Sequence, residues 1–396
     1  MHSRICTLMN CAVVTGSLAV MAAFSGAAQA QGLVAEPAPK WTALFDRTSG
    51  WTGADGIYAI PLSGYDVPGG DGAANAKTLI VFSDTFVGEV NEKGERLGGT
   101  TLVNNTAALL TGAQPTEDRI RFFVRNDANG KPRALAIPDT PNSNPDDWYW
   151  FQDGVSINGT VHVFALRMKT GNGGEFNFAV AGVARLHAPA NSSDPLRDMT
   201  QEDAPLFFHP EDGRGELIFG TSFMVNTEEA GSPNPDGYVY IYGTQNDAYS
   251  KKLLAARVTP DQFTDYTAWR YWDGSAWVEQ LENAAPLTGR VSSELSVSPL
   301  PSGRFICVFQ ADALGKEVGV RFGDSPIGPW GPMQRVYPCP ESDRDPDIFV
   351  YNAKAHPHLS RPGKLLISYN VNTFDFWDHF AFADIYRPRF IWLSIE

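Results

Sequence analysis

The sequence predicts an all-β protein, a single five-bladed β-propeller with four-stranded antiparallel blades around a central channel. Short apolar runs bounded by Gly, Asn, Asp and Pro recur along the chain, which is typical of strands and turns. Long stretches with the 3.6-residue apolar spacing of helices do not occur in it. One pattern also recurs five times, and internal repeats of this kind are typical of propellers.

Each repeat consists of a short strand-like segment with a polar residue, a turn, and a strongly apolar strand. The five short segments are 54–58, 152–156, 220–224, 293–297 and 353–357, and the apolar strands after them are 78–86, 161–166, 237–245, 303–312 and 363–372. The pair Asn158-Gly159 predicts a tight hairpin in the second repeat, because both residues tolerate positive φ. The repeats fill the chain without a linker, which argues against the alternative of two β-sandwiches.

The first thirty residues are predicted to be a signal peptide. A basic start at Arg4 precedes an apolar run, and Ala28-Gln29-Ala30 has the form of an A-x-A cleavage site. Cleavage after Ala30 leaves residues 31–396 as one propeller domain, exported by a bacterium and either secreted or periplasmic. A retained membrane anchor is the alternative. No other stretch is apolar enough to span a bilayer, so we expect no membrane partner after cleavage.

Composition limits the partners further. A formal net charge of −14 repels phosphate backbones, so nucleic acid is not an expected partner. Cys307 and Cys339 lie beyond the predicted cleavage site, and both a disulfide and free buried thiols stay open for them. Two cysteines without nearby histidines do not make a zinc site. We expect no metal or cofactor in the site, although a structural ion in the central channel stays an alternative. We also expect the protein to be a monomer.

The polar residues of the five short segments are expected to meet near one axis, because the innermost strand of each propeller blade lines the channel. They are Asp55, Asp153, Ser222, Glu294 and His356. Asp84 interrupts the apolar strand of "LIVFSDTFVG", where a carboxylate is costly unless it is paired or functional.

Asp55 and Asp84 are the candidate catalytic pair. Two carboxyls in one cleft suit glycoside hydrolysis, since one donates a proton to the leaving oxygen and the other activates water or attacks the sugar. The alternative is that both cap turns.

Other polar and aromatic residues are candidates for substrate binding. Asp153 and Glu294 could tune a pKa or bind a sugar hydroxyl, and Ser222 and His356 share their place in the repeat. Trp150 and Trp377 are candidate platforms for sugar rings. A structural role is the alternative for each of these residues.

The segments "GADGIYAIPL" and "LIVFSDTFVG" resemble the opening of a bacterial family of secreted five-bladed propellers that includes endo-D-arabinanases. The later segments "DGYVYIYGTQ", "AWRYWDGSAWV", "VRFGDSPIGPWG" and "AKAHPHLS…GKLLISYNVN" also resemble that family, so the resemblance covers nearly all of the mature chain. It implies hydrolysis of glycosidic bonds with inversion, and a catalytic pair that falls on Asp55 and Asp84. A Gly- and Asp-rich insertion, Ser63 to Ala76, departs from the family, and we expect it to reshape the cleft.

The sequence thus predicts a secreted glycoside hydrolase that cleaves furanose-type, arabinan-like polysaccharide linkages. A non-catalytic glycan-binding propeller is the alternative. A metal-dependent lactonase-type propeller is a third hypothesis, which requires several carboxylates and an Asn around one ion.

Overall fold

The computed structural model describes residues 33–171, 177–194, 196–197, 199–246 and 251–395, and this part of the chain is all-β. The predicted signal peptide, residues 1–30, lies outside the described residues. The α-helices of the described part are α1 (Pro39–Leu44) and α2 (Asp378–Ala381). Its 3₁₀ turns span Glu117–Arg119, Pro260–Gln262, Tyr266–Ala268, Leu281–Asn283, Pro340–Asp343 and Pro357–Leu359. None of these helices is long and apolar enough to cross a membrane.

Five larger sheets follow one another along the described chain. Sheet 1 contains β3 (Tyr58–Pro61), β4 (Lys77–Phe82), β7 (Thr106–Thr111) and β8 (Ile120–Phe123). Sheet 2 contains β11 (Trp148–Ile157), β12 (Thr160–Thr170), β13 (Phe178–Pro189) and β14 (Thr200–Ala204). Sheet 3 contains β15 (Phe207–Phe208), β16 (Glu216–Asn226), β17 (Tyr238–Asn246), β18 (Lys251–Val258), β19 (Arg270–Trp272) and β20 (Trp277–Val278), and β21 (Thr288–Val291) pairs with β18.

Sheet 4 contains β22 (Leu295–Pro299), β23 (Phe305–Gln310), β24 (Glu317–Gly323) and β25 (Gln334–Pro338). Sheet 5 contains β26 (Ile348–Ala355), β27 (Lys364–Thr373), β28 (Arg389–Ser394) and β1 (Ala35–Pro37). Two smaller sheets are formed by β2 (Ser49–Ala54), β5 (Thr85–Glu89) and β6 (Thr101–Val103), and by β9 (Arg125–Asn126) and β10 (Pro132–Arg133).

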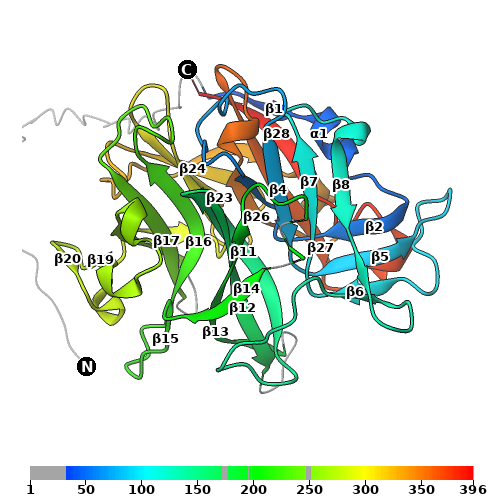
Figure 1. The fold of residues 1–396 in the computed structure, drawn as a ribbon. Helices are drawn as coiled ribbons and strands as arrows, with labels where there is room; N and C mark the ends of the chain where they lie inside the picture. Colours follow the sequence, from blue (N-terminus) through cyan, green and yellow to red (C-terminus); the bar gives the residue numbers. More distant parts are fainter. Residues whose placement is uncertain (1–32, 172–176, 195, 198, 247–250, 396) are drawn as a thin grey trace, which may run out of the picture. The chain divides into compact units, whose positions relative to one another are not determined.

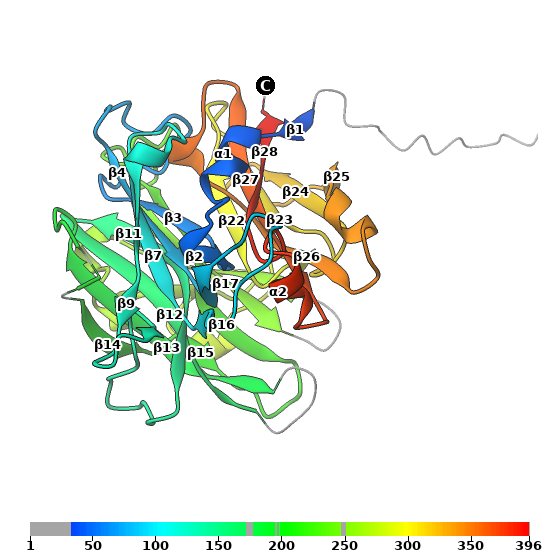
Figure 2. The same cartoon turned by 90° about the vertical axis from the view of Figure 1, so that its right-hand side faces the viewer.

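Neighbouring strands pair antiparallel, as short connections allow. The predicted hairpin at Asn158-Gly159 joins β11 to β12, and both residues have positive φ, 51° and 74°. Sheet 5 combines the two ends of the described chain, because β1 pairs with β28 through Ala35 and Leu393. In both Figure 1 and Figure 2, β1 lies beside β28.

Five buried hydrophobic clusters lie between successive sheets. They join sheet 1 to sheet 2, sheet 2 to sheet 3, sheet 3 to sheet 4, and sheet 4 to sheet 5. The fifth cluster joins sheet 5 to sheet 1, where Leu366 and Phe390 pack with Ile80 and Phe82. The sheets therefore contact one another in a closed order, and their hydrophobic faces are buried against each other.

The strand that corresponds to the predicted short segment is interrupted in every sheet. Register shifts fall between Phe151 and Gly154 in β11, between Phe219 and Ser222 in β16, and between Tyr351 and Lys354 in β26. In sheets 1 and 4 the strand breaks instead, so Asp55 lies between β2 and β3, and Glu294 lies between β21 and β22. The prediction that these two acids lie on inner strands is therefore wrong, since both lie in bends. Such interruptions re-aim side chains.

The two cysteines of the described chain are free and buried. Cys307 belongs to the cluster between sheets 3 and 4, and Cys339 belongs to the cluster between sheets 4 and 5. Of the two alternatives that the sequence left open, the structure has free thiols.

Candidate active site

One pocket of about 480 Å³ is lined by residues of sheets 2, 3 and 5 and by connecting segments next to the strands of sheets 1 and 4. Its acidic residues are Asp55, Asp84, Glu216 and Glu294. Its aromatic residues are Trp150, Phe151, Phe178, Phe349, Tyr351 and Tyr386. The pocket thus combines carboxyl groups with ring faces, which is the composition of a site for a polar ligand with apolar faces.

Backbone hydrogen bonds bring Asp55 and Asp84 together. The amide of Asp55 donates to the carbonyl oxygen of Asp84 at 3.2 Å, and the amide of Ser83 donates to the carbonyl oxygen of Asp55 at 3.0 Å. These bonds join the β2–β5 pairing to the β3–β4 pairing. Gly56 has φ +62°, and a Cβ there would lie 2.7 Å from the Ser83 hydroxyl oxygen, so glycine is required at this crossing.

Asp84 is a hydrogen-bonded carboxyl at the pocket wall. Its Oδ1 accepts hydrogen bonds from Trp150 Nε1 at 2.9 Å and from Asn104 Nδ2 at 3.3 Å. Burial raises the pKa of Asp84, and the two hydrogen bonds oppose that rise. The ionised form of Asp84 is therefore the form that its neighbours stabilise.

Asp55 lies in a different environment. The Tyr351 hydroxyl donates to Asp55 Oδ2 at 2.8 Å, whereas Oδ1 is buried and has no hydrogen-bond partner in the described chain. Burial raises the pKa of Asp55, and the charges of Asp84 and Glu294 raise it further. The phenols of Tyr351 and Tyr386 oppose this rise. The surroundings of Asp55 therefore favour its protonated form.

Glu294 is held as an ion pair. Its Oε2 lies 2.5 Å from Lys354 Nζ, and its Oε1 accepts a hydrogen bond from Asn352 Nδ2 at 2.9 Å. Lys354 is only 1% exposed, and its ammonium lies 4.3 Å from the centroid of the Tyr58 ring. The buried charge of Lys354 is thus matched by one carboxylate, as a buried charge requires.

Three predicted site residues lie outside this pocket. Asp153, Ser222 and His356 line a second pocket, which has a volume of about 20 Å³. A space of this size holds about one water molecule and is too small for a sugar ring. Gln152 and Asp153 are neighbours in β11, and their side chains lie in separate pockets because successive side chains of a strand point to opposite faces.

The residues of the second pocket are hydrogen-bonded within the fold. Asp153 Oδ2 accepts a hydrogen bond from the Phe223 amide at 2.8 Å, and burial raises the pKa of Asp153 to about 8. His356 Nε2 lies 2.8 Å from the Ser368 hydroxyl oxygen. Burial lowers the pKa of His356 well below its usual range, so its ring is neutral.

Trp377 also lies outside the pocket. It is 71% exposed and precedes α2 in the connection from β27 to β28, where its ring packs beside Phe376 and Phe380. Of the predicted residues, the structure therefore brings together Asp55, Asp84, Trp150 and Glu294.

The insertion from Ser63 to Ala76 lies at the other end of β4 from Asp84. The Gly69 amide donates to the Pro357 carbonyl oxygen at 3.2 Å, and Asp66 Oδ1 lies 2.7 Å from His358 Nδ1. Asp66 also lines the small pocket that contains Asp153. The expectation that this insertion reshapes the cleft is wrong, because none of its residues lines the pocket of Asp55.

Sequence reasoning missed the amide and phenol groups that support the acids. They are Asn104, Tyr351, Asn372 and Tyr386. Tyr351 stands two residues before the fifth repeat segment, which is the one signal that could have indicated it. The described residues contain no group of three or more His, Cys, Asp or Glu side chains that could hold a metal ion.

The fold and the pocket define an all-β chain of repeated sheets around a carboxyl-lined site. The chain belongs to the family described as "Domain of unknown function (DUF5005)", whose profile matches residues 39–394. No curated protein matches the chain in sequence.

Solved structures resemble the chain to different degrees. A Bacteroides ovatus ATCC 8483 protein, proposed to be a hydrolase, is 21% identical with a TM-score of 0.69, over 91% of this chain and 90% of that one. An α-L-arabinofuranosidase from Podospora anserina is 11% identical with a TM-score of 0.45, over 87% and 98% of the two chains. An endo-arabinase from Bacteroides thetaiotaomicron VPI-5482 is 11% identical with a TM-score of 0.42, over 86% and 97%. Of these three, the Bacteroides ovatus protein is similar enough to indicate a shared fold.

Proposed function

We propose that the protein is a secreted glycoside hydrolase in which Asp55 is the general acid and Asp84 is the general base. The observation that carries this proposal is a single pocket in which two neighbouring carboxyls have unequal surroundings. Glycoside hydrolysis needs one protonated and one ionised carboxyl, and unequal surroundings separate their pKa values.

Asp55 suits the role of the acid because burial and the nearby charges of Asp84 and Glu294 help it to keep its proton. That proton would pass to the glycosidic oxygen as the bond from this oxygen to the anomeric carbon breaks. Asp84 suits the role of the base because Trp150 and Asn104 donate hydrogen bonds to it. It would take a proton from the water that attacks the anomeric carbon from the opposite face, which inverts the configuration.

The proposal includes the five-bladed propeller and the export of the protein. The closed order of five sheets, the five clusters between them, and a small pocket lined from all five sheets support the propeller. The order of residues in segment 1–30 supports a signal peptide that is cleaved after Ala30. The enzyme would act outside the cytoplasm as a monomer without a cofactor.

The proposed substrate is a furanose-type, arabinan-like polysaccharide. The resemblance of "GADGIYAIPL" and "LIVFSDTFVG" to the arabinanase-containing family supports this class. The walls of the pocket also suit a sugar, because Trp150 and Phe178 meet at 4.6 Å between ring centroids and Phe349 offers another ring. These rings would serve a non-catalytic glycan-binding propeller equally well, so activity has to decide between the two.

The test is a product-release screen on D-arabinan, L-arabinan and fructan with the wild type, Asp55→Asn, Asp84→Asn and the exposed control Glu92→Gln. We expect each pocket variant to lose about 10²–10⁴-fold in kcat while glycan binding persists. The control should keep full activity. Proton NMR of the first product anomer would report inversion.

Binding of a glycan by a wild-type protein that releases no product from any polysaccharide would instead support the non-catalytic propeller. Full activity in Asp84→Asn would remove the assignment of the base.

A further inference from the structure

We propose that Asn372 and His379 are positioning residues that direct the hydroxyl hydrogen of Tyr351 onto Asp55. Arg96 holds this chain of hydrogen bonds in place. The inference rests on the proposed function, because it treats Asp55 as a reacting carboxyl. It concerns residues that do not touch the carboxyls themselves, and none of them was indicated by the sequence.

The phenol of Tyr351 is the last link before Asp55. Its hydroxyl donates to Asp55 Oδ2 at 2.8 Å, and its oxygen accepts a hydrogen bond from Asn372 Nδ2 at 3.2 Å. A hydroxyl that accepts from one side has its own hydrogen free for the other side. Asn372 therefore selects the direction in which the Tyr351 hydrogen points.

The amide of Asn372 is fixed by two contacts to its oxygen. Its Oδ1 accepts a hydrogen bond from the Thr373 amide at 2.8 Å and lies 2.8 Å from His379 Nε2. A carbonyl oxygen only accepts, so the two contacts assign Oδ1 to this side and Nδ2 to the side of Tyr351. The contact to His379 also requires a hydrogen on Nε2.

His379 is buried, and its ring is packed on both sides. The ring lies 5.1 Å from the centroid of Tyr386 at 84° and 5.2 Å from that of Phe86. Burial and Arg96 lower the pKa of His379 to about 4, so the ring is neutral and carries one hydrogen. Both ring nitrogens face acceptors, because Nδ1 lies 3.0 Å from the Phe376 carbonyl oxygen and Nε2 lies 2.8 Å from Asn372 Oδ1. The single hydrogen of the neutral ring serves one of them, and in our proposal it lies on Nε2.

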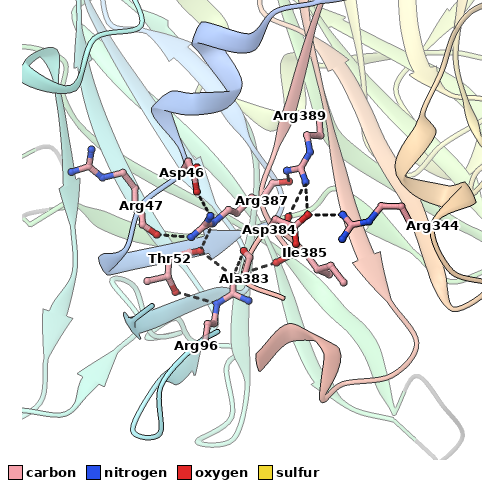
Figure 3. Close-up of polar contacts among 10 residues, drawn as sticks. All are labelled: Asp46, Arg47, Thr52, Arg96, Arg344, Ala383, Asp384, Ile385, Arg387 and Arg389. Carbon is pink, nitrogen blue, oxygen red and sulfur yellow. Dashed lines mark hydrogen bonds and ion pairs between the residues drawn. The ribbon is translucent and has the colours of Figure 1, made fainter. Parts of the chain in front are cut away.

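Arg96 ties the segment of His379 to the strand that leads into Asp55. Figure 3 shows its guanidinium between Thr52 and the carbonyl groups of Ala383 and Ile385, which accept hydrogen bonds at 3.1 and 3.2 Å. It also donates to the carbonyl oxygen of Thr52 at 2.9 Å and to that of His379. Hydrogen bonds from a buried guanidinium are strong because the donor is charged. Arg96 therefore fixes His379 relative to β2.

The backbone at Gly53 lies so close to Arg96 and Tyr386 that no side chain fits there. A Cβ at Gly53 would overlap the Arg96 guanidinium and would lie 2.5 Å from the carbonyl oxygen of Tyr386. Tyr386 itself has φ +71°, a conformation that is rare for a residue with a side chain. The strand before Asp55 and the segment after α2 are therefore held against each other through Arg96.

The test follows the titration of the Asp55 carboxyl by ¹³C NMR, with the signal assigned by its loss in Asp55→Asn. Groups that face Asp55 are Asp84, Glu294, Tyr351 and Tyr386, and Arg96, Asp375 and Asp378 lie near His379. These groups are the same in the wild type, His379→Leu and Asn372→Leu. A difference in the Asp55 midpoint between these proteins therefore reports the hydrogen-bond chain from His379 through Asn372 to Tyr351. We expect His379→Leu and Asn372→Leu to raise the Asp55 midpoint, because its ionised form loses a directed donor.

His379→Gln should keep the wild-type midpoint, because its amide can still donate to Asn372. The matched control is Asn104→Leu, which should raise the midpoint of Asp84. It should not raise that of Asp55, because an Asp84 that stays protonated to higher pH repels the Asp55 charge less. In kinetics we expect the alkaline limb of kcat/KM to move with the Asp55 midpoint, and kcat to fall about two- to tenfold, the effect of one neutral hydrogen bond. KM should not change.

If His379→Leu fails to fold, Asn372→Leu and the double variant Tyr351→Phe/Asn372→Leu carry the test. The double variant should behave like Tyr351→Phe alone, since both changes cut one chain of bonds. If the two single losses of kcat add up in the double variant, or if folded Asn372→Leu has the wild-type Asp55 midpoint, the proposed hydrogen-bond chain is overturned. The NMR titration needs no substrate, so a protein that hydrolyses no glycan would remove the proposed function and leave this test intact.

Discussion

At the scale of single residues, Asp55 and Asp84 show that two side chains of the same type can differ in how readily they ionise. Asp84 accepts two hydrogen bonds at one oxygen, whereas Asp55 accepts one and faces the charges of Asp84 and Glu294. Each donated hydrogen bond favours the ionised form, and each neighbouring negative charge disfavours it. Which of the two carboxyls keeps its proton more readily therefore depends on residues far away in sequence, such as Trp150 and Glu294.

The sequence could predict that Asp55 and Asp84 lie next to each other. It could not predict which side chains contact the two carboxyl groups. The repeat placed Asp55 and Asp84 in the same unit, which suffices for two residues that share backbone hydrogen bonds. Tyr351 and Lys354 occupy one strand and line different pockets, and the register shifts between them. The groups that surround each carboxyl come from other sheets, and a shift of this kind changes which residues of a strand face them.

The pH dependence of activity should reflect the raised pKa values of both carboxyls. In the proposed mechanism Asp84 acts as the base and must be ionised, so the acidic limb of kcat/KM should follow its pKa. Asp55, the proposed acid, must be protonated, so the alkaline limb should follow the pKa of Asp55. Burial raises both pKa values. Both limbs of the bell-shaped pH dependence of kcat/KM should therefore lie at higher pH than for two aspartates with ordinary pKa values. A pH–rate profile on the best glycan checks this. An acidic limb near pH 4, the usual range of aspartate, would contradict it.

Asp153→Asn should stabilise the protein at alkaline pH. Burial raises the pKa of Asp153 to about 8, so its stabilising contribution is full below the unfolded pKa and is lost as pH rises towards 8. The variant removes this loss and keeps an oxygen for the Phe223 amide. Urea unfolding at pH 5 and pH 9 should show a gain in the variant that grows with pH and exceeds about 1.4 kcal/mol, the value of one pKa unit.

The control for this measurement is Asp127→Asn, in an exposed turn where hydrogen bonds lower the pKa of Asp127. It should show no gain at pH 9. An Asp153→Asn variant whose stability follows that of the wild type at both pH values would show that Asp153 ionises freely.

At the scale of elements, the insertion between β3 and β4 illustrates where sequence reasoning fails. Its length and glycine content were evident, and so was its place before β4, whereas Asp84 follows β4. The order along the chain therefore already placed the insertion at the end of the strand that is remote from Asp84, and the expectation overlooked this. Asp66 contacts His358 in the turn between β26 and β27 of sheet 5, and a Cβ at Gly64 would lie 3.0 Å from the Ser156 carbonyl oxygen of sheet 2. The insertion therefore contacts several sheets at the end that is remote from the acids.

Replacing residues 63–76 by Asn-Gly should lower stability and leave the activity unchanged. The Leu62 amide donates to the Lys77 carbonyl oxygen at 2.8 Å, so a two-residue hairpin can join these positions. The variant loses the contact of Asp66 with His358 and uncovers the pocket of Asp153. Thermal unfolding should show a lower midpoint, and kcat/KM should match the wild type. A large loss of kcat/KM in the folded variant would show that the insertion does shape the active site.

At the scale of the whole described chain, the two ends close one sheet. The order of the five sheets could be predicted from the internal repeats, because each repeat is one unit that must bury its faces against neighbours. The pairing of β1 with β28 could not, since a three-residue strand carries too little pattern to be recognised. Closure by β1 covers the edge of β28, which would otherwise offer unpaired backbone groups.

A chain that begins at residue 38 should therefore be less stable than one that begins at residue 33. The shorter chain loses the pairing of Glu36 with Trp392 and of Pro37 with Ile391, the hydrogen bond from the Ser394 amide to Val34, and the ion pair of Glu36 with Lys364. Differential scanning calorimetry should show a lower midpoint for it, with aggregation through the exposed edge of β28 after heating. The pocket of Asp55 contains no residue of β1, so kcat/KM below the midpoint should be the same for both chains. Equal midpoints would mean that β1 adds nothing to the closure of sheet 5.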